Sequence, residues 1–290
     1  MVVDAAYAHC LRLARQHYEN FPVASRLLPR EMRPHIAAIY AFVRIADDFA
    51  DEGTRSDAAR LALLDDWERR LDEAAAGTTK DDGSDMSAIF LALGATIHQR
   101  RVDVKHLRDM LSAFRQDVTV KRYETWPDVL DYCSRSANPV GRMVLQVAGY
   151  RDAALDAASD ATCTALQLTN FWQDFQGDWA RGRLYVPNEI VRQTGADERD
   201  LDRRRMTPQW RAALSDASAR TRALFDAGRP VADGVSGRLR WELRATWLGG
   251  VRILDRLEAV GFDVYRRRPT LGTKDALPLA WRLLTWRRRP

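Results

Sequence analysis

Three oxygen-bearing side chains recur at every fourth position of one apolar stretch, and they are Asn170, Asp174 and Asp178. On an α-helix this spacing places them on one face, stacked turn above turn. Their neighbours are mostly large and apolar, namely Leu166, Leu168, Phe171, Trp172, Phe175 and Trp179. A row of carboxylates on an otherwise buried helix is costly unless a cation offsets the charge, and hard oxygen ligands favour Mg²⁺. The pattern therefore predicts a long helix whose acidic face either meets solvent or binds cations.

A second acidic cluster, Asp47 and Asp51, has the same four-residue spacing and also follows a strongly apolar run. Two helices that each carry such a pair can face each other across a cavity and hold several Mg²⁺ ions and a diphosphate between them. The transfer of a prenyl group from a diphosphate needs that arrangement. The two clusters together therefore indicate diphosphate chemistry more strongly than either cluster alone.

Composition and charge limit the kinds of protein that this sequence can encode. The 290 residues, 46% hydrophobic and 29% charged, suffice for one large core or two closely packed subdomains. A net charge of +5 fits an anionic substrate or membrane surface, but it is too dispersed for nucleic acid. Three cysteines indicate a reducing compartment without disulfides, so we expect a cytoplasmic protein. The sequence shows neither a signal peptide nor an apolar run long enough to span a bilayer.

No stretch alternates between apolar and polar residues at period two, so the sequence predicts an all-α protein. Pro34 opens a helix as an early-position proline, and Ser56 caps the next helix. Pro139 should kink or break the helix that begins after Thr125, and residues 78–85 read as a mobile polar loop. The expected helices cover residues 4–18, 34–53, 56–77, 86–100, 104–119, 152–180, 208–228 and 238–260.

In this order the motifs resemble those of the squalene/phytoene synthase family over most of the chain. Residues 47–51, preceded by Tyr-Ala-Phe at 40–42 and by Arg44, look like the family's first aspartate-rich motif. Residues 170–178, followed by Arg-Gly-Arg-Leu-Tyr-Val-Pro at 181–187, look like the second. Further matches lie between them, at Asp117, Arg122, Tyr123, Glu124, Thr125, Tyr132 and Cys133. The resemblance implies an isoprenoid-synthase-type helical bundle, a single domain over residues 1–290 around a central apolar cavity. It also implies Mg²⁺-dependent chemistry on farnesyl-type diphosphates.

Oxygen atoms of both motifs are the expected Mg²⁺ ligands, from Asp47, Asp48, Asp51, Asn170, Asp174 and Asp178. Asp48 is the weaker member of this set, and Asn170 is also a candidate for contact with the diphosphate. Arg44 lies one turn before the first motif and either binds diphosphate oxygens bidentately or pairs with an aspartate. Arg181 and Arg183 either grip the diphosphate or favour the C-terminal end of the helix.

Tyr132 matches a family tyrosine near the reacting carbons, and an ordinary core tyrosine is the alternative. The walls of the implied cavity should be apolar and aromatic, because such walls exclude water and stabilise a carbocation. Candidate wall residues are Phe21, Phe42, Phe171 and Trp172.

Two segments, 19–25 and 134–141, depart from the members that condense two chains head to head. Both resemble the hopanoid-pathway branch that makes hydroxysqualene from presqualene diphosphate. That reaction needs one admitted water, which Asn138 and Ser136 are candidates to position. It needs no reductant, in agreement with the missing Gly-x-Gly-x-x-Gly fingerprint.

Three other functions stay open beside this one. The first is head-to-head condensation of two farnesyl or geranylgeranyl diphosphates. The second is a non-catalytic relative that serves as an assembly or binding module, although a scaffold has no need of buried carboxylates. A class I terpene cyclase is disfavoured, because both aspartate motifs and the Arg-Gly-Arg segment follow the synthase pattern.

The C-terminal residues 275–290 are apolar, carry tryptophans and end in a basic run. One interpretation is a peripheral contact with the inner face of the cell membrane, which suits a hydrophobic product. The other is a last helix packed on the bundle with a solvated basic tail. The sequence names no protein partner.

Overall fold

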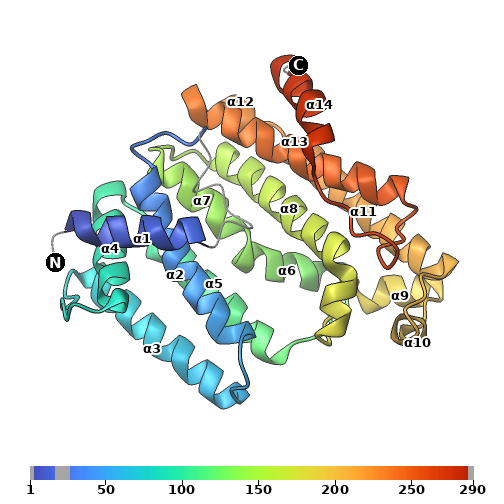
Figure 1. Ribbon diagram of the computed structural model, residues 1–290, viewed down its shortest axis with the longest axis horizontal. Coiled ribbons are helices and arrows are strands. Elements are labelled where there is room, and N and C mark those ends of the chain that lie inside the picture. The colour runs from blue at the N-terminus through green and yellow to red at the C-terminus, as the bar shows by residue number, and fades with distance from the viewer. Residues whose placement is uncertain (1–2, 17–26, 287–290) are drawn as a thin grey trace. The chain divides into compact units, whose positions relative to one another are not determined.

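The computed structural model describes residues 3–16 and 27–286, and these residues form helices and connections without a strand (Figure 1). Its helices are α1 (Val3–Gln16), α2 (Arg33–Asp51), α3 (Asp57–Ala76), α4 (Asp85–Arg100), α5 (Val104–Thr119), α6 (Trp126–Ser136), α7 (Asn138–Val147), α8 (Ala153–Ala180), α9 (Asn188–Thr194), α10 (Glu198–Asp202), α11 (Pro208–Gly228), α12 (Val231–Gly234), α13 (Gly237–Ala259) and α14 (Thr273–Leu284). The predicted all-α fold class is therefore confirmed. The segment 19–25 and its Phe21 lie outside the described residues.

Local signals in the sequence set most helix ends. The Ser56 hydroxyl accepts a hydrogen bond from the backbone of α3, and that helix ends at Gly77 with φ of 72°. Thr125 forms a capping box at the start of α6. Helix α6 ends at Ser136, and Pro139 stands in the first turn of α7, so the predicted break is confirmed. The sequence analysis missed α9, α10 and α12, because helices of seven, five and four residues show no periodicity.

The chain divides into two compact units, which we describe separately. Unit 1 comprises Met1–Thr119 and Pro139–Ala153, and unit 2 comprises Val120–Asn138 and Ala154–Pro290. The single domain over residues 1–290 and its central cavity stay predictions.

An aromatic cluster holds α2, α3 and α4 together in unit 1. The rings of Trp67 and Phe90 lie 4.6 Å apart, and Phe42 packs against both at 5.7 and 6.0 Å. The Trp67 indole donates a hydrogen bond of 3.2 Å to the carbonyl of Phe42, so its polar atom is satisfied in the core. This packing fixes α2, the helix that carries the first acidic pair. The structure thus places Phe42 in the core of unit 1.

A buried polar triangle joins α1 to α2 and α4. Tyr7 Oη, His35 Nδ1 and Thr96 Oγ1 lie 3.0–3.1 Å from one another. All three side chains are buried, and burial lowers the pKa of His35 to about 4, with Arg100 adding to the shift. The neutral imidazole is therefore the form that unit 1 packs around.

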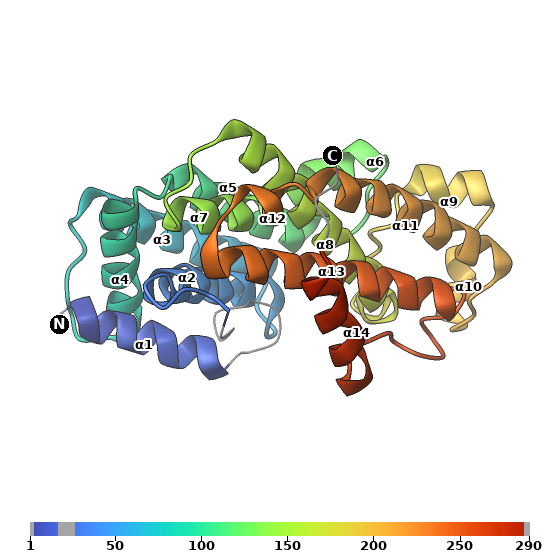
Figure 2. The ribbon, with the colours of Figure 1, turned by 90° about the horizontal axis from the view of Figure 1, so that it is seen from above.

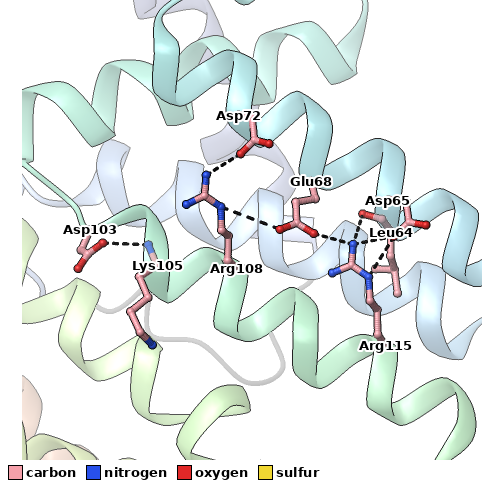
Figure 3. Close-up of polar contacts among 8 residues, drawn as sticks. All are labelled: Leu64, Asp65, Glu68, Asp72, Asp103, Lys105, Arg108 and Arg115. Atoms are coloured by element: carbon pink, nitrogen blue, oxygen red, sulfur yellow. Dashed lines mark hydrogen bonds and ion pairs between the residues drawn. The ribbon is translucent and has the colours of Figure 1, made fainter.

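Surface ion pairs connect α3 with α5 (Figure 3). Arg115 lies 2.7 Å from Glu68 and 2.8 Å from Asp65, and Arg108 lies 2.7 Å from Asp72. Because these pairs are partly exposed, each contributes at most ~1 kcal/mol to stability.

Helix α8 is the centre of unit 2, and α11 buries one side of it. A Cβ on Gly228 would lie only 2.3 Å from the Thr162 hydroxyl, so the close approach of the two helices requires glycine there. The Trp172 indole donates to Thr221 at 2.9 Å inside this contact, and Phe175 meets Trp210 at 5.5 Å. The structure thus places Trp172 in the core of unit 2.

Candidate functional site

Helix α8 presents the second acidic motif as the sequence predicts. Asp174 is half-buried and Asp178 is buried, four residues apart on one helix of 28 residues. The helix ends just beyond, at Ala180, and Gly182 follows with φ of 77°. The backbone N–H of Arg183 donates a hydrogen bond of 2.8 Å to the carbonyl of Asp178. This bond holds the Arg-Gly-Arg segment against the motif.

Asp178 is a carboxylate in an apolar setting. Burial raises its pKa, and the hydrogen bond from Arg181, 2.6 Å long, opposes that rise. Arg181 is otherwise exposed, whereas Arg183 is buried. Arg181 is thus paired with the motif, and the contact of both arginines with a diphosphate stays a prediction.

Asp174 is paired with a residue that the sequence analysis did not single out. Arg268, in the segment between α13 and α14, donates a hydrogen bond to the Asp174 carboxylate. Beside it, Gln173 donates to the carbonyl of Pro269 at 2.5 Å. The segment after α13 is therefore tied to the second motif at two adjacent residues. The run Arg266–Arg268 before Pro269 was visible in the sequence, but nothing local connected it to Asp174.

The first acidic motif lies at the C-terminal end of α2. Arg44 forms ion pairs with Asp48 at 2.7 Å, with Asp47 at 3.4 Å and with Glu52 at 3.1 Å. The Nε atom of Arg44 is buried and has no hydrogen-bond partner in the described residues. Asp51 is exposed. The structure thus shows the aspartate pairing that was one alternative for Arg44, while its contact with a diphosphate stays a prediction.

The carboxylate oxygens of both motifs fit Mg²⁺ that takes only one or two ligands from the protein. Among the described residues, no group of three or more His, Cys, Asp or Glu side chains converges to hold a metal ion. Mg²⁺ does not require such a cage, because it commonly takes one or two carboxylates and completes its octahedron with phosphate oxygens and water. The ligands would be Asp47, Asp51, Asp174 and Asp178, with Asp48 and Asn170 beside them. Since the two motifs belong to different units, their facing each other stays a prediction.

Tyr132 lies in an aromatic cluster of unit 2. Its ring is 5.7 Å from Tyr123, 6.1 Å from Phe171 and 6.1 Å from Tyr185. Phe171 and Tyr185 stack with ring centroids 3.6 Å apart. Phe171 precedes Asp174 by three residues, so the aromatic cluster borders the acidic face of α8. Tyr185 belongs to the segment that follows the second motif, so this segment contributes a ring to the aromatic cluster.

Two polar groups without full partners lie at the break between α6 and α7. The buried Ser136 hydroxyl has no hydrogen-bond partner in the described residues. Thr164 donates to the Asn138 side-chain oxygen at 2.8 Å. Ser136 stands one turn after Tyr132 on α6, and Thr164 stands two turns before Phe171 on α8. Ser136 therefore shares a face of α6 with Tyr132, and Asn138 is bonded to a side chain on the face of α8 that carries Phe171.

Comparisons with known proteins agree with this arrangement. The family model described as squalene/phytoene synthase matches residues 14–275. A hydroxysqualene synthase of Zymomonas mobilis is 40% identical over 71% of this chain and 67% of its own length. A 15-cis-phytoene synthase of Synechococcus elongatus is 32% identical over 96% of this chain and 93% of its own. The crystal structure of squalene synthase HpnC from Alicyclobacillus acidocaldarius superposes with a TM-score of 0.83 at 39% identity, covering 90% of this chain and 95% of that one.

The fold and these matches define an all-α enzyme of the isoprenoid synthase type. The chain belongs to the squalene/phytoene synthase family, whose members act on prenyl diphosphates. The resemblance read from the motifs is confirmed, and a non-catalytic role is set aside. Hydroxysqualene synthases stand beside phytoene synthases among its relatives.

Proposed function

We propose that this enzyme converts presqualene diphosphate and water to hydroxysqualene and diphosphate, as a step of hopanoid and squalene biosynthesis. The observation that carries the proposal is the pair of under-satisfied polar groups, Ser136 and Asn138, beside the aromatic cluster of Tyr132. The hydroxysqualene synthases at 36–40% identity support the same choice. A hydrophobic product also suits an enzyme that works in the cytoplasm at the inner face of the membrane.

The first step breaks the carbon–oxygen bond to the diphosphate, and the electron pair leaves with the diphosphate. Mg²⁺ bound at the acidic motifs would neutralise the developing charge as a Lewis acid. Arg44 is suited to this step, because its fork can exchange carboxylate oxygens for diphosphate oxygens of the same geometry. Arg181 and Arg183 flank Asp178 and would add positive charge at the same place.

The resulting carbocation needs an environment that neither attacks it nor admits bulk water. Tyr132, Phe171 and Tyr185 supply aromatic faces, whose negative quadrupole attracts a cation. All three side chains are buried, so their surroundings exclude bulk water. The aromatic cluster thus stabilises the intermediate for long enough to be captured at one carbon.

Capture requires one positioned water. The Ser136 hydroxyl is buried without a partner in the described chain, and the Asn138 amide nitrogen makes no hydrogen bond there. A buried polar group of this kind is normally satisfied by an ordered water. The water oxygen forms the new bond to carbon, and its proton passes to solvent or to the departing diphosphate.

One incubation tests the proposal. Purified enzyme with Mg²⁺ should consume presqualene diphosphate and release hydroxysqualene without a nicotinamide cofactor, and in heavy-oxygen water the product hydroxyl should carry the label. Ser136→Ala should lower the share of hydroxylated product up to about tenfold, the scale of one lost hydrogen bond. Ser134→Ala is the matched control, because Ser134 is an exposed serine on the same helix whose hydroxyl donates to the backbone carbonyl of Asp131.

Head-to-head condensation is the second candidate, because the Synechococcus phytoene synthase matches nearly the whole chain. Efficient formation of presqualene diphosphate or phytoene from linear diphosphates would overturn the first proposal and establish this one. Equal product distributions in Ser136→Ala and Ser134→Ala would remove the assigned water site.

A further inference from the structure

Helix α14 carries the most exposed of the large apolar side chains among the described residues. Leu277, Trp281 and Leu284 are 82%, 68% and 72% exposed. Their spacing of four and three residues places them on one face of the helix. Isolated exposed apolar residues are ordinary on protein surfaces, but a contiguous row with a tryptophan at its centre marks a surface that binds something.

The N-terminal end of α14 is held firmly on unit 2. Asp275 is only 1% exposed and lies 3.0 Å from Arg252 and 2.7 Å from Arg256. The same carboxylate accepts the backbone N–H of Gly272 at 2.7 Å. The pKa of Asp275 is accordingly lowered by this backbone hydrogen bond and by the two arginines. A buried, fully paired carboxylate fixes the first turn of the helix.

The other end is held by an aromatic contact. The Trp286 indole donates to Asp233 at 3.0 Å, and its ring meets Trp247 at 5.3 Å. The Arg229 guanidinium lies 4.2 Å from the same ring. Both ends of α14 are thus anchored, while Figures 1 and 2 show the helix projecting from α13. The outward apolar face is therefore built into unit 2 and does not arise from fraying.

Basic residues accompany this face. Lys274 and Arg282 are exposed on the same helix, and the sequence continues as Arg287, Arg288 and Arg289. The nearest acidic group to Arg282 is Asp255 at 3.8 Å, a contact too long to hold it tightly. None of the described helices is long and apolar enough to cross a membrane. An apolar row flanked by cations suits the boundary of an anionic bilayer, where tryptophan and basic residues both gather.

We propose that α14 docks this enzyme on an anionic lipid bilayer. Leu277, Trp281 and Leu284 insert at the level of the upper acyl chains, and Lys274 and Arg282 contact lipid phosphates. A second copy of the chain fits the face less well, because a symmetric pairing through α14 would bring the basic residues of both copies together. The docking is independent of the reaction proposed above, since neither the acidic motifs nor the aromatic cluster takes part.

Flotation with vesicles tests the docking. Full-length enzyme should bind vesicles that contain phosphatidylglycerol and not vesicles of phosphatidylcholine alone, and raised salt should weaken the binding. The triple variant Leu277→Gln, Trp281→Gln, Leu284→Gln should bind at least tenfold more weakly. Val3→Gln with Met86→Gln is the matched control, because these exposed apolar residues of unit 1 lie on other helices.

Two further measurements keep the outcome decisive. Lys274→Glu with Arg282→Glu preserves the apolar face and should abolish the preference for anionic lipid. Quenching by brominated lipid should be reduced in Trp281→Phe. Equal vesicle binding by wild type and both multiple variants would overturn the proposal. So would a concentration-dependent dimer in sedimentation that the triple variant cannot form, since it would assign the face to a second copy.

Discussion

Arg268 and Asp174 are 94 residues apart in the sequence, yet the guanidinium of one donates to the carboxylate of the other. The contact ties the segment between α13 and α14 to the second acidic motif on α8. It offsets the charge of a carboxylate that is expected to hold Mg²⁺. Arg268 would therefore compete with a metal ion that binds at Asp174.

Replacing Arg268 by alanine should strengthen metal binding to the substrate-free enzyme. The competing cation is lost, and a partly exposed ion pair of this kind amounts to at most ~1 kcal/mol, or about fivefold in affinity. Titration with Mn²⁺, followed by paramagnetic resonance, measures the change. The control is Arg267→Ala, whose exposed side chain forms no ion pair in the described structure. Identical affinities in the two variants would contradict the competition.

Substitution of one aspartate in either motif should disable catalysis. Asp47→Asn or Asp174→Asn nearly preserves shape but removes a charge that offsets the metal, so turnover should fall by at least ~10²-fold. Activity should also disappear in chelator and return with added Mg²⁺. Asp65→Asn removes an exposed carboxylate that pairs with Arg115 and should leave turnover unchanged. Normal rates in both motif variants, or full activity in chelator, would refute the metal assignment.

Asp178→Asn should lower turnover without lowering the stability of the fold. Burial raises the pKa of this carboxyl, so the ionised form costs more free energy in the folded chain than in the unfolded chain. The neutral amide removes that cost, and the melting temperature should stay equal or rise while turnover falls. Calorimetry and an activity assay on the same preparation test both halves. A marked loss of melting temperature would mean that the pair with Arg181 stabilises the fold more than burial of the charge weakens it.

Acid should destabilise unit 1 through His35. The pKa of its imidazole falls from an ordinary 6.5 to about 4 in the folded chain. Between these values the unfolded chain binds more protons, so stability is complete above about pH 6.5 and is lost as the pH falls toward 4. The loss amounts to at most ~3 kcal/mol.

Denaturant unfolding at several pH values measures this loss. His35→Gln retains a hydrogen-bonding group without a titrating proton and should flatten the pH dependence below pH 6.5. His98→Gln, which changes an exposed histidine on α4, should leave it unchanged. Parallel pH profiles for wild type and His35→Gln would show that the buried triangle does not govern acid sensitivity.

The sequence by itself determined the all-α class, most helix bounds and the position of both acidic motifs. These features depend on signals within one or two turns: the cap at Ser56, the capping box at Thr125 and the four-residue spacing of Asp174 and Asp178. Hydrogen bonding and side-chain direction along a helix are local, so a pattern of residues is enough to reveal them.

Only the tertiary structure decided which groups meet across long separations. It paired Arg268 with Asp174, left the Ser136 hydroxyl without a partner in the described chain, and anchored α14 through Asp275 and Trp286. The sequence left the C-terminal segment open between a packed helix and a membrane contact. The structure packs both ends of α14 on unit 2 and leaves an apolar face exposed, while the membrane contact stays a proposal. Such outcomes depend on where distant helices pack, and local periodicity carries no information about that.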